Sequence, residues 1–254
     1  MFRAVIPARY ASSRLPGKVL LSISGKPMLQ WVYERARASQ AAEVLIATDD
    51  LLVVSAAHSF GAETVMTQAA HQSGTDRIAE VARARGWPDN DIVVNVQGDE
   101  PLLPPVLLDQ VAQLLQQHPE ADIATLATAM HSVEELLDPN TVKVVTDATG
   151  RALYFSRAPI PWDRDGATGG VASQKRYASA RRHIGIYAYR VHSLLQLASL
   201  PASALERTER LEQLRALESG MQIRVAKAQQ QPGPDVNTAA DLDRVSAALR
   251  HHGG

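Results

Sequence analysis

Short apolar runs rich in valine and isoleucine alternate with longer segments of helical period along the first half of the chain. The apolar runs predict strands at residues 2–8, 43–48, 64–67, 91–96 and 122–130. The segments between them predict helices at residues 28–39, 51–60, 75–85 and 104–117. This alternation is typical of an α/β fold, in which a mostly parallel sheet is flanked by helices on both faces.

The pattern changes near residue 140. Strands expected at residues 142–146, 152–156 and 184–190 have little helix between them, which predicts a smaller mixed-sheet layer. The polar, glycine-rich residues 163–170 predict a mobile loop. Further along, we expect a helix at 203–219, a strand at 222–228 and a last helix at 238–250. We interpret residues 1–254 as one domain, with a core of about 1–140 and 220–254 and a subdomain of about 141–219.

Composition narrows the class of protein. Of the 254 residues, 45% are apolar, as expected for a globular chain. The 26 basic and 27 acidic residues leave a net charge of −1, which argues against general nucleic-acid or membrane-surface binding. The absence of cysteine excludes disulfides and zinc–cysteine sites.

Targeting signals are not evident. The apolar stretch at the start of the chain is too short for a signal peptide, and Pro7 follows at once. No apolar run approaches the roughly 20 residues that a membrane helix needs. We therefore expect a soluble cytoplasmic protein without membrane insertion.

The loop after the first predicted strand, residues 8–18 (ARYASSRLPGK), is strongly basic. Ligands of α/β sheets bind at the carboxyl ends of the strands, where this loop lies. Four cations belong to it or follow closely, before the first acidic residue of the chain: Arg9, Arg14, Lys18 and Lys26. Arginine and lysine are the side chains that hold phosphates, so the loop predicts a triphosphate site. The alternative is an ordinary solvated basic loop.

Two common phosphate-binding motifs do not fit this loop. The dinucleotide-binding turn needs three spaced glycines, and the loop has only Gly17. The P-loop needs serine or threonine after its lysine, but Lys18 is followed by Val19. The loop is therefore expected to bind phosphate in another way.

A second signal lies at residues 94–101 (VNVQGDEP), where a buried strand runs into a glycine, two acids and a proline. The strand end should deliver Asp99 to the same edge of the sheet as the basic loop. Mg²⁺ in proteins is held by one or two carboxylates together with substrate phosphates. We therefore favour Asp99 as a metal ligand, although Gly-Asp and Glu-Pro are also ordinary turn formers.

Together these segments resemble the CMP-Kdo synthetases, the cytidylyltransferases that activate 3-deoxy-D-manno-octulosonate (Kdo). The resemblance spans nearly the whole chain. It is carried by the ordered motifs at residues 6–18 (IPARYASSRLPGK), 25–29 (GKPML), 72–77 (QSGTDR), 94–101 (VNVQGDEP), 152–165 (ALYFSRAPIPWDRD), 182–190 (RHIGIYAYR) and 211–217 (LEQLRAL).

The resemblance implies a reaction and an architecture. The anomeric hydroxyl of Kdo would attack the α-phosphate of CTP, giving CMP-Kdo for lipopolysaccharide and releasing pyrophosphate. The family fold implies a Rossmann-like nucleotidyltransferase sheet, a homodimer and a need for Mg²⁺. The core would bind nucleotide, and residues 141–219 would bind sugar and form the dimer.

The resemblance also implies roles for the first loop and its neighbours. Lys18, Arg14 and Asp99 would be the catalytic residues, with Lys18 contacting the transition state. The nucleotide would be bound by residues of two loops and one helix: Ala8, Arg9, Ser12, Ser13, Arg14, Lys18, Ser73, Gly74 and Arg77. Backbone groups near Ala8 and Ser73–Gly74 would read the cytosine, and Arg77 would meet a phosphate unless it is a solvated helix residue.

The sugar acid needs a cation for its carboxylate. Arg157 follows an apolar strand and offers a bidentate fork, the alternative being an exposed strand-end arginine. Arg164, in the predicted mobile loop, would close over the substrate or else remain a solvated charge.

Polar partners are needed for the sugar hydroxyls. His183 and Tyr187 lie four residues apart on one predicted strand, so both should face the same way. His183 would orient a hydroxyl, although a lone histidine is more often structural. Gln97 would reach the same pocket or cap a turn.

Only the resemblance makes Glu212 and Gln213 sugar contacts. The leucine spacing around them buries one stripe of a helix. By spacing alone, Glu212 and Arg215 would form a surface ion pair.

The second metal ligand departs from the family pattern, which ends the site with Val-Asp-Thr. Here the matching stretch is Val236-Asn237-Thr238. Asn237 keeps a carbonyl oxygen that can bind Mg²⁺, and Asp235 lies two residues earlier on the same predicted side. We therefore assign the metal to Asp99, Asn237 and Asp235, and expect weaker binding or a shifted second metal.

Three alternatives stay open at this point. A sister cytidylyltransferase would activate 8-amino-Kdo or sialic acid. A metal-dependent glycosyltransferase would use Asp99 with a nucleotide sugar. A catalytically silent nucleotide-binding protein is allowed by the change to Asn237.

Overall fold

The structure, a computed structural model, describes residues 1–11, 15–236 and 238–252. In this part of the chain the main sheet is built from the strands β1 (Phe2–Pro7), β4 (Glu43–Thr48), β5 (Glu63–Met66), β6 (Ile92–Asn95), β7 (Ile123–Ala129), β8 (Lys143–Thr146), β9 (Ala152–Ser156), β10 (Arg181–Arg190) and β11 (Ile223–Lys227). A separate small hairpin pairs β2 (Ser22–Ile23) with β3 (Lys26–Pro27).

The helices of the described chain are α1 (Met28–Arg37), α2 (Leu51–Ser59), α3 (Gly74–Arg85), α4 (Pro105–Gln117), α5 (Val133–Leu137), α6 (Val191–Ser199), α7 (Ala204–Glu209), α8 (Gln213–Glu218) and α9 (Ala239–His252). Two short 3₁₀ turns, η1 (Lys18–Leu20) and η2 (Val171–Ser173), complete the set. None of these described helices is long and apolar enough to cross a membrane.

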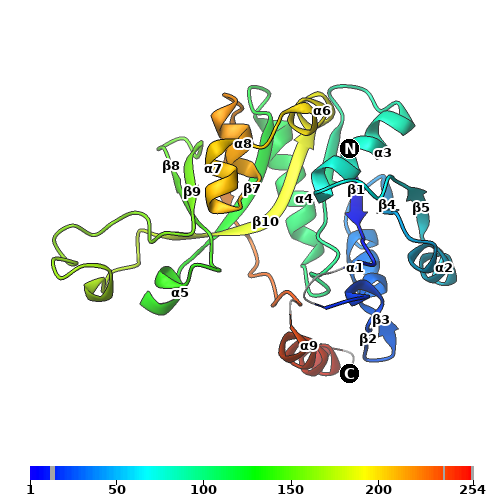
Figure 1. Cartoon of the computed structure of the whole chain (residues 1–254), viewed down its shortest axis with the longest axis horizontal. Coiled ribbons are helices and arrows are strands. Elements are labelled where there is room, and N and C mark those ends of the chain that lie inside the picture. Colours follow the sequence, from blue (N-terminus) through cyan, green and yellow to red (C-terminus); the bar gives the residue numbers. More distant parts are fainter. Residues whose placement is uncertain (12–14, 237, 253–254) are drawn as a thin grey trace.

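The sheet is mostly parallel, as the sequence predicts. Its strands run in the order β11-β7-β10-β6-β1-β4-β5 (Figure 1). The pairs β6–β1, β1–β4, β4–β5 and β11–β7 are parallel, whereas β10 runs antiparallel to both of its neighbours. The first residues of β10 also pair with β8, and β8 pairs with β9. Strands β8 and β9 form the smaller antiparallel layer.

The placement of β10 differs from the sequence interpretation. The strand expected at residues 184–190 was assigned to the smaller layer, but β10 lies between β7 and β6 in the central sheet. A strand that is paired along both edges and covered on both faces has an apolar sequence whether it lies in the central sheet or in the smaller layer. Its sequence therefore does not tell which of the two it joins. Strand pairing, which local pattern does not encode, decides between the two positions.

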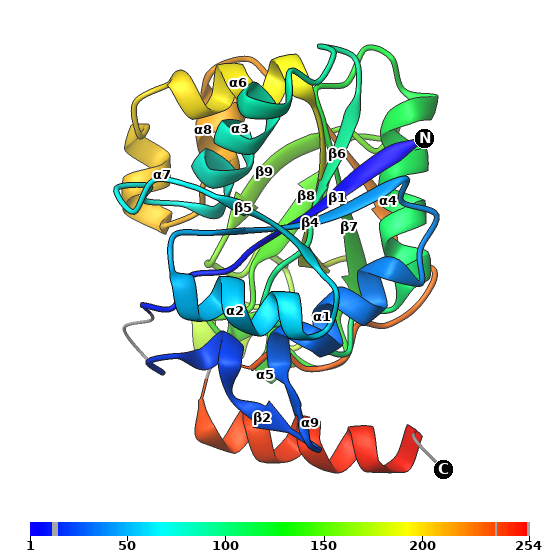
Figure 2. The same cartoon turned by 90° about the vertical axis from the view of Figure 1, so that its right-hand side faces the viewer.

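Helices cover both faces of the sheet and create two large apolar cores (Figure 2). Side chains of α1, α2 and α4 pack on one face, and those of α3, α6 and α8 pack on the other. Along β1, Ala4 and Ile6 enter the first core while Val5 enters the second. Burial on both faces explains why the strand reads as a continuous apolar run.

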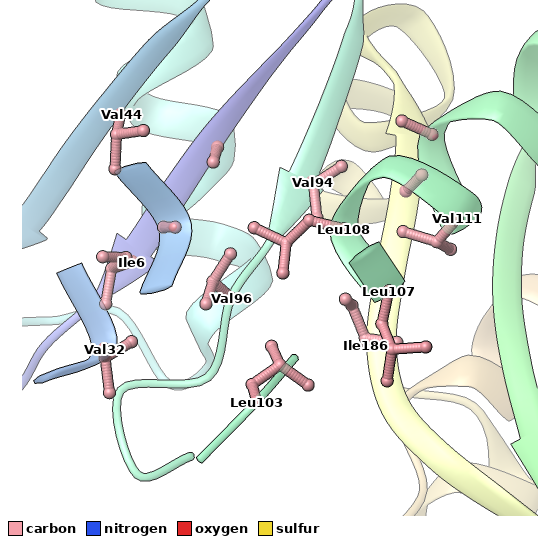
Figure 3. Close-up of a cluster of buried hydrophobic side chains, with 14 of the residues drawn as sticks. Ile6, Val32, Val44, Val94, Val96, Leu103, Leu107, Leu108, Val111 and Ile186 are labelled. Carbon is pink, nitrogen blue, oxygen red and sulfur yellow. The ribbon is translucent and has the colours of Figure 1, made fainter. Parts of the chain in front are cut away.

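The first core joins three strands to α4 (Figure 3). Ile6 of β1, Val94 of β6 and Ile186 of β10 share it with Leu107 and Leu108 of α4, and all five side chains are fully or almost fully buried. This packing fixes the ends of β1 and β6 relative to each other. The loops that leave those two strands are the ones that the sequence singles out.

The predicted helix at residues 203–219 is wrong as a single element, because it is divided into α7 and α8. Ser203 and Glu206 form a capping box that starts α7. Arg210 adopts φ 54°, in the left-handed region, and ends it. A residue in that conformation cannot continue a right-handed helix, so the chain turns before α8 begins.

The glycine-rich region around residues 163–170 contains no strand or α-helix, as expected for a loop. It belongs to a long connection between β9 and β10 that projects away from the sheet (Figure 1).

Helix α9 lies apart from the two large cores, below the β2–β3 hairpin in Figure 2. It is held there by a third, small apolar cluster that includes Ile23, Met28, Val236, Val245 and Leu249.

Candidate active site

The basic loop and the Asp99 loop meet directly. Lys18 opens η1 at the end of the loop after β1, and Asp99 follows β6. The Lys18 ammonium donates to Asp99 Oδ2 at 2.7 Å and to the backbone oxygen of Val236 at 2.9 Å. The Val236 N–H in turn donates to the backbone oxygen of Asp99 at 2.9 Å. Three distant segments are thus joined at one point.

Lys18 and Asp99 border a cavity of about 860 Å³. Its lining comes from the loop after β1, the start of α3 and the loop after β6: Pro7, Arg9, Tyr10, Ala11, Pro16, Lys18, Val19, Gly74, Arg77, Gln97, Gly98 and Asp99. A cavity of this size is in the range of small-molecule sites, and cationic and anionic groups stand on its walls. It can therefore take a charged ligand.

Two glycines let the walls approach each other. A Cβ on Gly98 would lie 3.1 Å from the backbone oxygen of Pro7, and one on Gly74 would lie 3.1 Å from Pro7 Cγ. Both contacts are tighter than side chains normally tolerate. Glycine at these positions brings the Asp99 loop and the start of α3 against the end of β1.

Lys26 does not belong to the cationic wall. Its ammonium is bound by the Glu34 carboxylate at 2.8 Å and 2.9 Å, and it lies over the Trp31 ring. Lys26, which the sequence analysis grouped with the phosphate-binding cations, is therefore neutralised by the first acidic residue of the chain. The helix α1 brings Glu34 back to it, which the linear order of charges does not reveal.

Arg77 is fully buried, so the alternative of a solvated helix arginine is wrong. Its Nη1 donates to Thr67 Oγ1, and its Nη2 lies 3.3 Å from Asp49 Oδ2. Within the described part of the chain, its Nε has no hydrogen-bond partner. The side chain braces the ends of β4 and β5 at the cavity wall, and a charge this deeply buried is retained only beside a partner.

Glu100, beside Asp99, is a partly buried acid that the sequence analysis did not select. Its Oε2 atom is buried and has no hydrogen-bond partner among residues 1–11, 15–236 and 238–252. Burial, followed by the nearby charges of Asp99 and Asp235, raises the pKa of the Glu100 carboxyl to about 8, against the opposing effect of Arg182. The two adjacent acids of the GDEP motif could have drawn attention to Glu100. Tertiary packing, which the sequence does not show, decides which of the two acids is the more buried.

The acids around this point do not form a complete metal cage. No group of three or more histidine, aspartate or glutamate side chains in residues 1–11, 15–236 and 238–252 is arranged to hold a metal ion. Asp99 and Asp235 both act on Glu100, and the bond between Val236 and Asp99 holds the segment of Asp235 against the Asp99 loop. Any metal here would need further ligands, as expected where substrate phosphates complete the shell.

The start of α3 is rigidly capped. Ser73 accepts from the Asp76 N–H and Asp76 accepts from the Ser73 N–H, which makes a capping box. Thr75 donates to Glu212 Oε2 at 2.8 Å, which ties α3 to the region of α8. The N–H of Ala8, on the opposite wall, already donates to the backbone oxygen of Ala47 at 2.8 Å.

Glu212 is more than a surface partner of Arg215. The two side chains do lie 3.4 Å apart, but Arg215 is 8% exposed and binds Glu206 more closely, at 2.7 Å and 2.8 Å. Burial raises the pKa of the Glu212 carboxyl, which the hydrogen bonds from Ser73 and Thr75 partly offset. The expected ion pair therefore forms, but its arginine is buried, so it is not a surface pair.

His183 and Tyr187 face the same side of β10, as their spacing predicts. Their rings are 5.3 Å apart, and the His183 ring meets Phe155 edge-on at 5.0 Å. The imidazole Nε2 lies 3.0 Å from Thr125 Oγ1. Burial lowers the pKa of His183 to about 3, so the ring is neutral at physiological pH.

A search of known proteins gives the chain its family. The model of the family described as "Cytidylyltransferase" matches residues 3–223. The chain belongs to the cytidylyltransferase family. A relative from Thioalkalivibrio sulfidiphilus, called 3-deoxy-manno-octulosonate cytidylyltransferase, is 56% identical over 98% of this chain and 99% of its own length. One of the same name from Pseudomonas syringae pv. tomato is 54% identical over 98% of each chain.

Solved structures agree with this membership. A CMP:2-keto-3-deoxy-manno-octonic acid synthetase complexed with CTP is 44% identical and superposes with a TM-score of 0.89 over 98% of both chains. A glucose-1-phosphate thymidylyltransferase described as putative, from Bacillus anthracis, is 17% identical with a TM-score of 0.66 over 98% of this chain and 96% of its own. The second likeness concerns the fold alone.

The cavity of this cytidylyltransferase brings together six of the residues singled out from the sequence: Arg9, Lys18, Gly74, Arg77, Gln97 and Asp99. Ala8 and Ser73 each adjoin a residue of that lining. Ser12, Ser13, Arg14 and Asn237 lie outside the described residues.

The candidate sugar-binding residues are more dispersed. Gln97 connects the cavity to strand β10. It lines the cavity, and its Nε2 donates to the backbone oxygen of Gly185 in β10 at 3.4 Å. Other candidates stand outside the lining of the cavity, on β10 or beside it: His183, Tyr187, Glu212 and Gln213. Gln213 is 8% exposed.

The two candidate arginines differ in their surroundings. The Arg157 guanidinium donates from Nε to the backbone oxygen of Glu209 at 2.6 Å and from Nη1 to that of Pro139 at 2.9 Å. Arg164 is exposed in the loop between β9 and β10. The structure therefore uses much of Arg157 to hold its own loops and leaves Arg164 at the surface.

Proposed function

We propose that this cytidylyltransferase transfers CMP from CTP to the anomeric hydroxyl of Kdo, giving CMP-Kdo for lipopolysaccharide and releasing pyrophosphate. The Lys18–Asp99 contact at the edge of the cavity carries the proposal, because it joins a phosphate-binding cation to a metal-binding acid. Kdo as the acceptor is supported by the relatives called 3-deoxy-manno-octulosonate cytidylyltransferase, which are 51% to 56% identical over nearly the full chain.

The cationic wall would act on the triphosphate. Lys18, with Arg9 and Arg14 from the same loop, would offset the negative charge that grows on pyrophosphate as its bond to the α-phosphorus breaks. The anomeric oxygen forms the new bond to that phosphorus. Ala8, Ser12, Ser13, Ser73, Gly74 and Arg77 complete the proposed nucleotide site.

Mg²⁺ is proposed as the cofactor, with Asp99 and Asp235 as ligands and Asn237 as an additional oxygen donor. The donor set fits, because hard carboxylate and amide oxygens suit this ion and the triphosphate would supply the rest. When bound, the metal would neutralise phosphate charge and orient the α-phosphate. Lys18 shares Oδ2 of Asp99, so this pair would loosen as metal and nucleotide enter.

The sugar is proposed to lie between the Asp99 loop and β10. Gln97 bridges these elements, and His183, Tyr187, Glu212 and Gln213 would shape the region beyond it. Arg157 and Arg164 remain the proposed partners of the sugar carboxylate. Residues 141–219 would supply this region and the surface of a homodimer, in the cytoplasm where CTP is made available.

A pyrophosphate-release assay tests the proposal. With CTP, Kdo and Mg²⁺ we expect pyrophosphate and CMP-Kdo in equal amounts. UTP or ATP in place of CTP should give far less. Faster release with 8-amino-Kdo or sialic acid would assign the alternative acceptor, and no release with any of these sugar acids would refute the proposed activity. Light scattering of the purified protein tests the homodimer separately.

A further inference from the structure

We infer that helix α9 positions the Lys18–Asp99 pair, acting through the backbone of Val236. The inference rests on the proposed function for its effect on catalysis, and on the contacts themselves for its effect on structure. Val236 is not a catalytic residue in this view. It is a positioning residue whose oxygen holds the Lys18 ammonium and whose N–H holds the backbone at Asp99.

Val236 contacts both members of the pair at once. Its oxygen accepts from the Lys18 ammonium at 2.9 Å, and its N–H donates to the backbone oxygen of Asp99 at 2.9 Å. The Lys18–Asp99 bond of 2.7 Å closes the ring. If Val236 moved away, the ammonium would lose one of the two acceptors that it has in the described structure, and the Asp99 loop would lose a backbone bond.

The side chain of Val236 is fixed by α9. It is completely buried in the small cluster with Val245 and Leu249 of α9, Ile23 of β2 and Met28 of α1. Trp31, whose Nε1 donates to the backbone oxygen of Ile23 at 2.8 Å, packs on the rim of that cluster. The position of the Val236 backbone therefore depends on whether α9 is docked.

The small cluster is separate from the two large cores that hold the sheet. A satellite cluster of few apolar side chains opens at lower free energy than a main core, so α9 can loosen while the sheet stays folded. Loosening it would disturb the Lys18–Asp99 geometry without removing either residue. Misplacement of about an ångström is enough to reduce turnover strongly.

Leu249→Ala tests the inference, because it leaves a cavity in the α9 cluster at a position that lies in neither large core. We expect kcat to fall about tenfold, while KM for CTP changes by less than about threefold. Hydrogen–deuterium exchange without substrates should quicken about tenfold at the Val236 amide and stay slow in β1 and β6. Leu249→Met, which conserves volume, should restore both readouts.

Two control variants separate positioning from general loss of stability. Leu197→Ala makes the same truncation in α6, in the second large core and remote from α9 (Figure 1). It should lower the melting temperature and leave kcat unchanged at a temperature where the protein is folded. Asp243→Ala, on the exposed side of α9, should change neither kcat nor exchange. If Leu249→Ala does not fold, Leu242→Ala, at a partly buried position of the same cluster, replaces it.

The outcomes are distinct. Faster exchange at Val236 with unchanged kcat would overturn the catalytic part, and unchanged exchange at Val236 would overturn the coupling to α9. Equal loss of kcat in Leu249→Ala and Leu197→Ala would reduce α9 to a general stabiliser. Should the wild-type protein release no pyrophosphate, the proposed function fails, whereas the exchange comparison still decides whether α9 holds Val236.

Discussion

The Lys18 ammonium lies 2.7 Å from Asp99 Oδ2, although 81 positions separate the two residues in the chain. The contact is possible because β1 and β6 are neighbouring parallel strands, so the loops that leave their carboxyl ends emerge side by side. Both side chains are partly exposed, at 14% for Lys18 and 27% for Asp99. A ligand can therefore reach the pair without unfolding anything.

Lys18→Ala should lower kcat by about 10² to 10³ and raise KM for CTP much less, because its ammonium would act on charge that develops in the transition state. Steady-state kinetics with varied CTP measures both constants. Lys26→Ala is the matched control, since Lys26 is an ion-paired lysine bound to Glu34 and outside the cavity lining. An equal effect of Lys18→Ala on kcat and on CTP binding would make Lys18 a uniform binding residue.

Asp99→Asn should abolish pyrophosphate release, with a loss of at least about 10², while the melting temperature stays close to that of the wild type. The amide keeps the shape of the side chain, and the backbone bond from Val236 to residue 99 does not depend on the charge. Isothermal titration with Mg²⁺ and CTP should show weaker metal binding. Unchanged turnover would remove Asp99 from the metal site. Asp243→Asn, on the exposed side of α9, serves as the neutral control.

Much of this site could be predicted from sequence, because its main residues lie in short segments that directly follow predicted strands. The basic loop after the first strand and the acid after an apolar strand can each be recognised in a short stretch of sequence. The rule that parallel strands deliver their loops to one edge then brings them together. The meeting of Lys18 and Asp99 in one cavity confirms that prediction.

Other features depend on packing and could not be predicted in this way. The burial of Arg77 and the ion pair of Lys26 with Glu34 arise from helix placement. Strand β10 reaches the centre of the sheet through pairing between distant segments. The Val236 contacts use backbone groups, which every residue carries, so no side-chain motif marks them.

Gly98→Ala should destabilise the protein by about 1–3 kcal/mol and reduce turnover, because the new Cβ would lie 3.1 Å from the backbone oxygen of Pro7. That oxygen belongs to β1 and cannot move aside as a flexible side chain would, so the Asp99 loop must shift. Urea unfolding and kinetics measure the two effects. For stability, Gly185→Ala is the comparison, since its Cβ would meet Glu100 Oε1 at an ordinary 3.7 Å. Equal stability of both variants and the wild type would contradict the steric argument.

His183→Gln should make the protein less sensitive to mild acid. The Thr125 hydroxyl donates its single hydrogen to a backbone carbonyl at 2.7 Å, so it accepts from a neutral His183 ring. Because burial lowers the pKa of His183 to about 3, the unfolded chain binds a proton below about pH 6.5 that the folded chain does not. Stability is therefore lost as the pH falls from 6.5 towards 3, by about 2 kcal/mol at pH 5 from this residue.

Urea unfolding at pH 7 and pH 5 should show a smaller loss of stability in His183→Gln than in the wild type. His58→Gln is the matched control, because that exposed imidazole also contacts a threonine hydroxyl, at 3.1 Å. An acid dependence that His183→Gln leaves unchanged would place its origin elsewhere in the molecule.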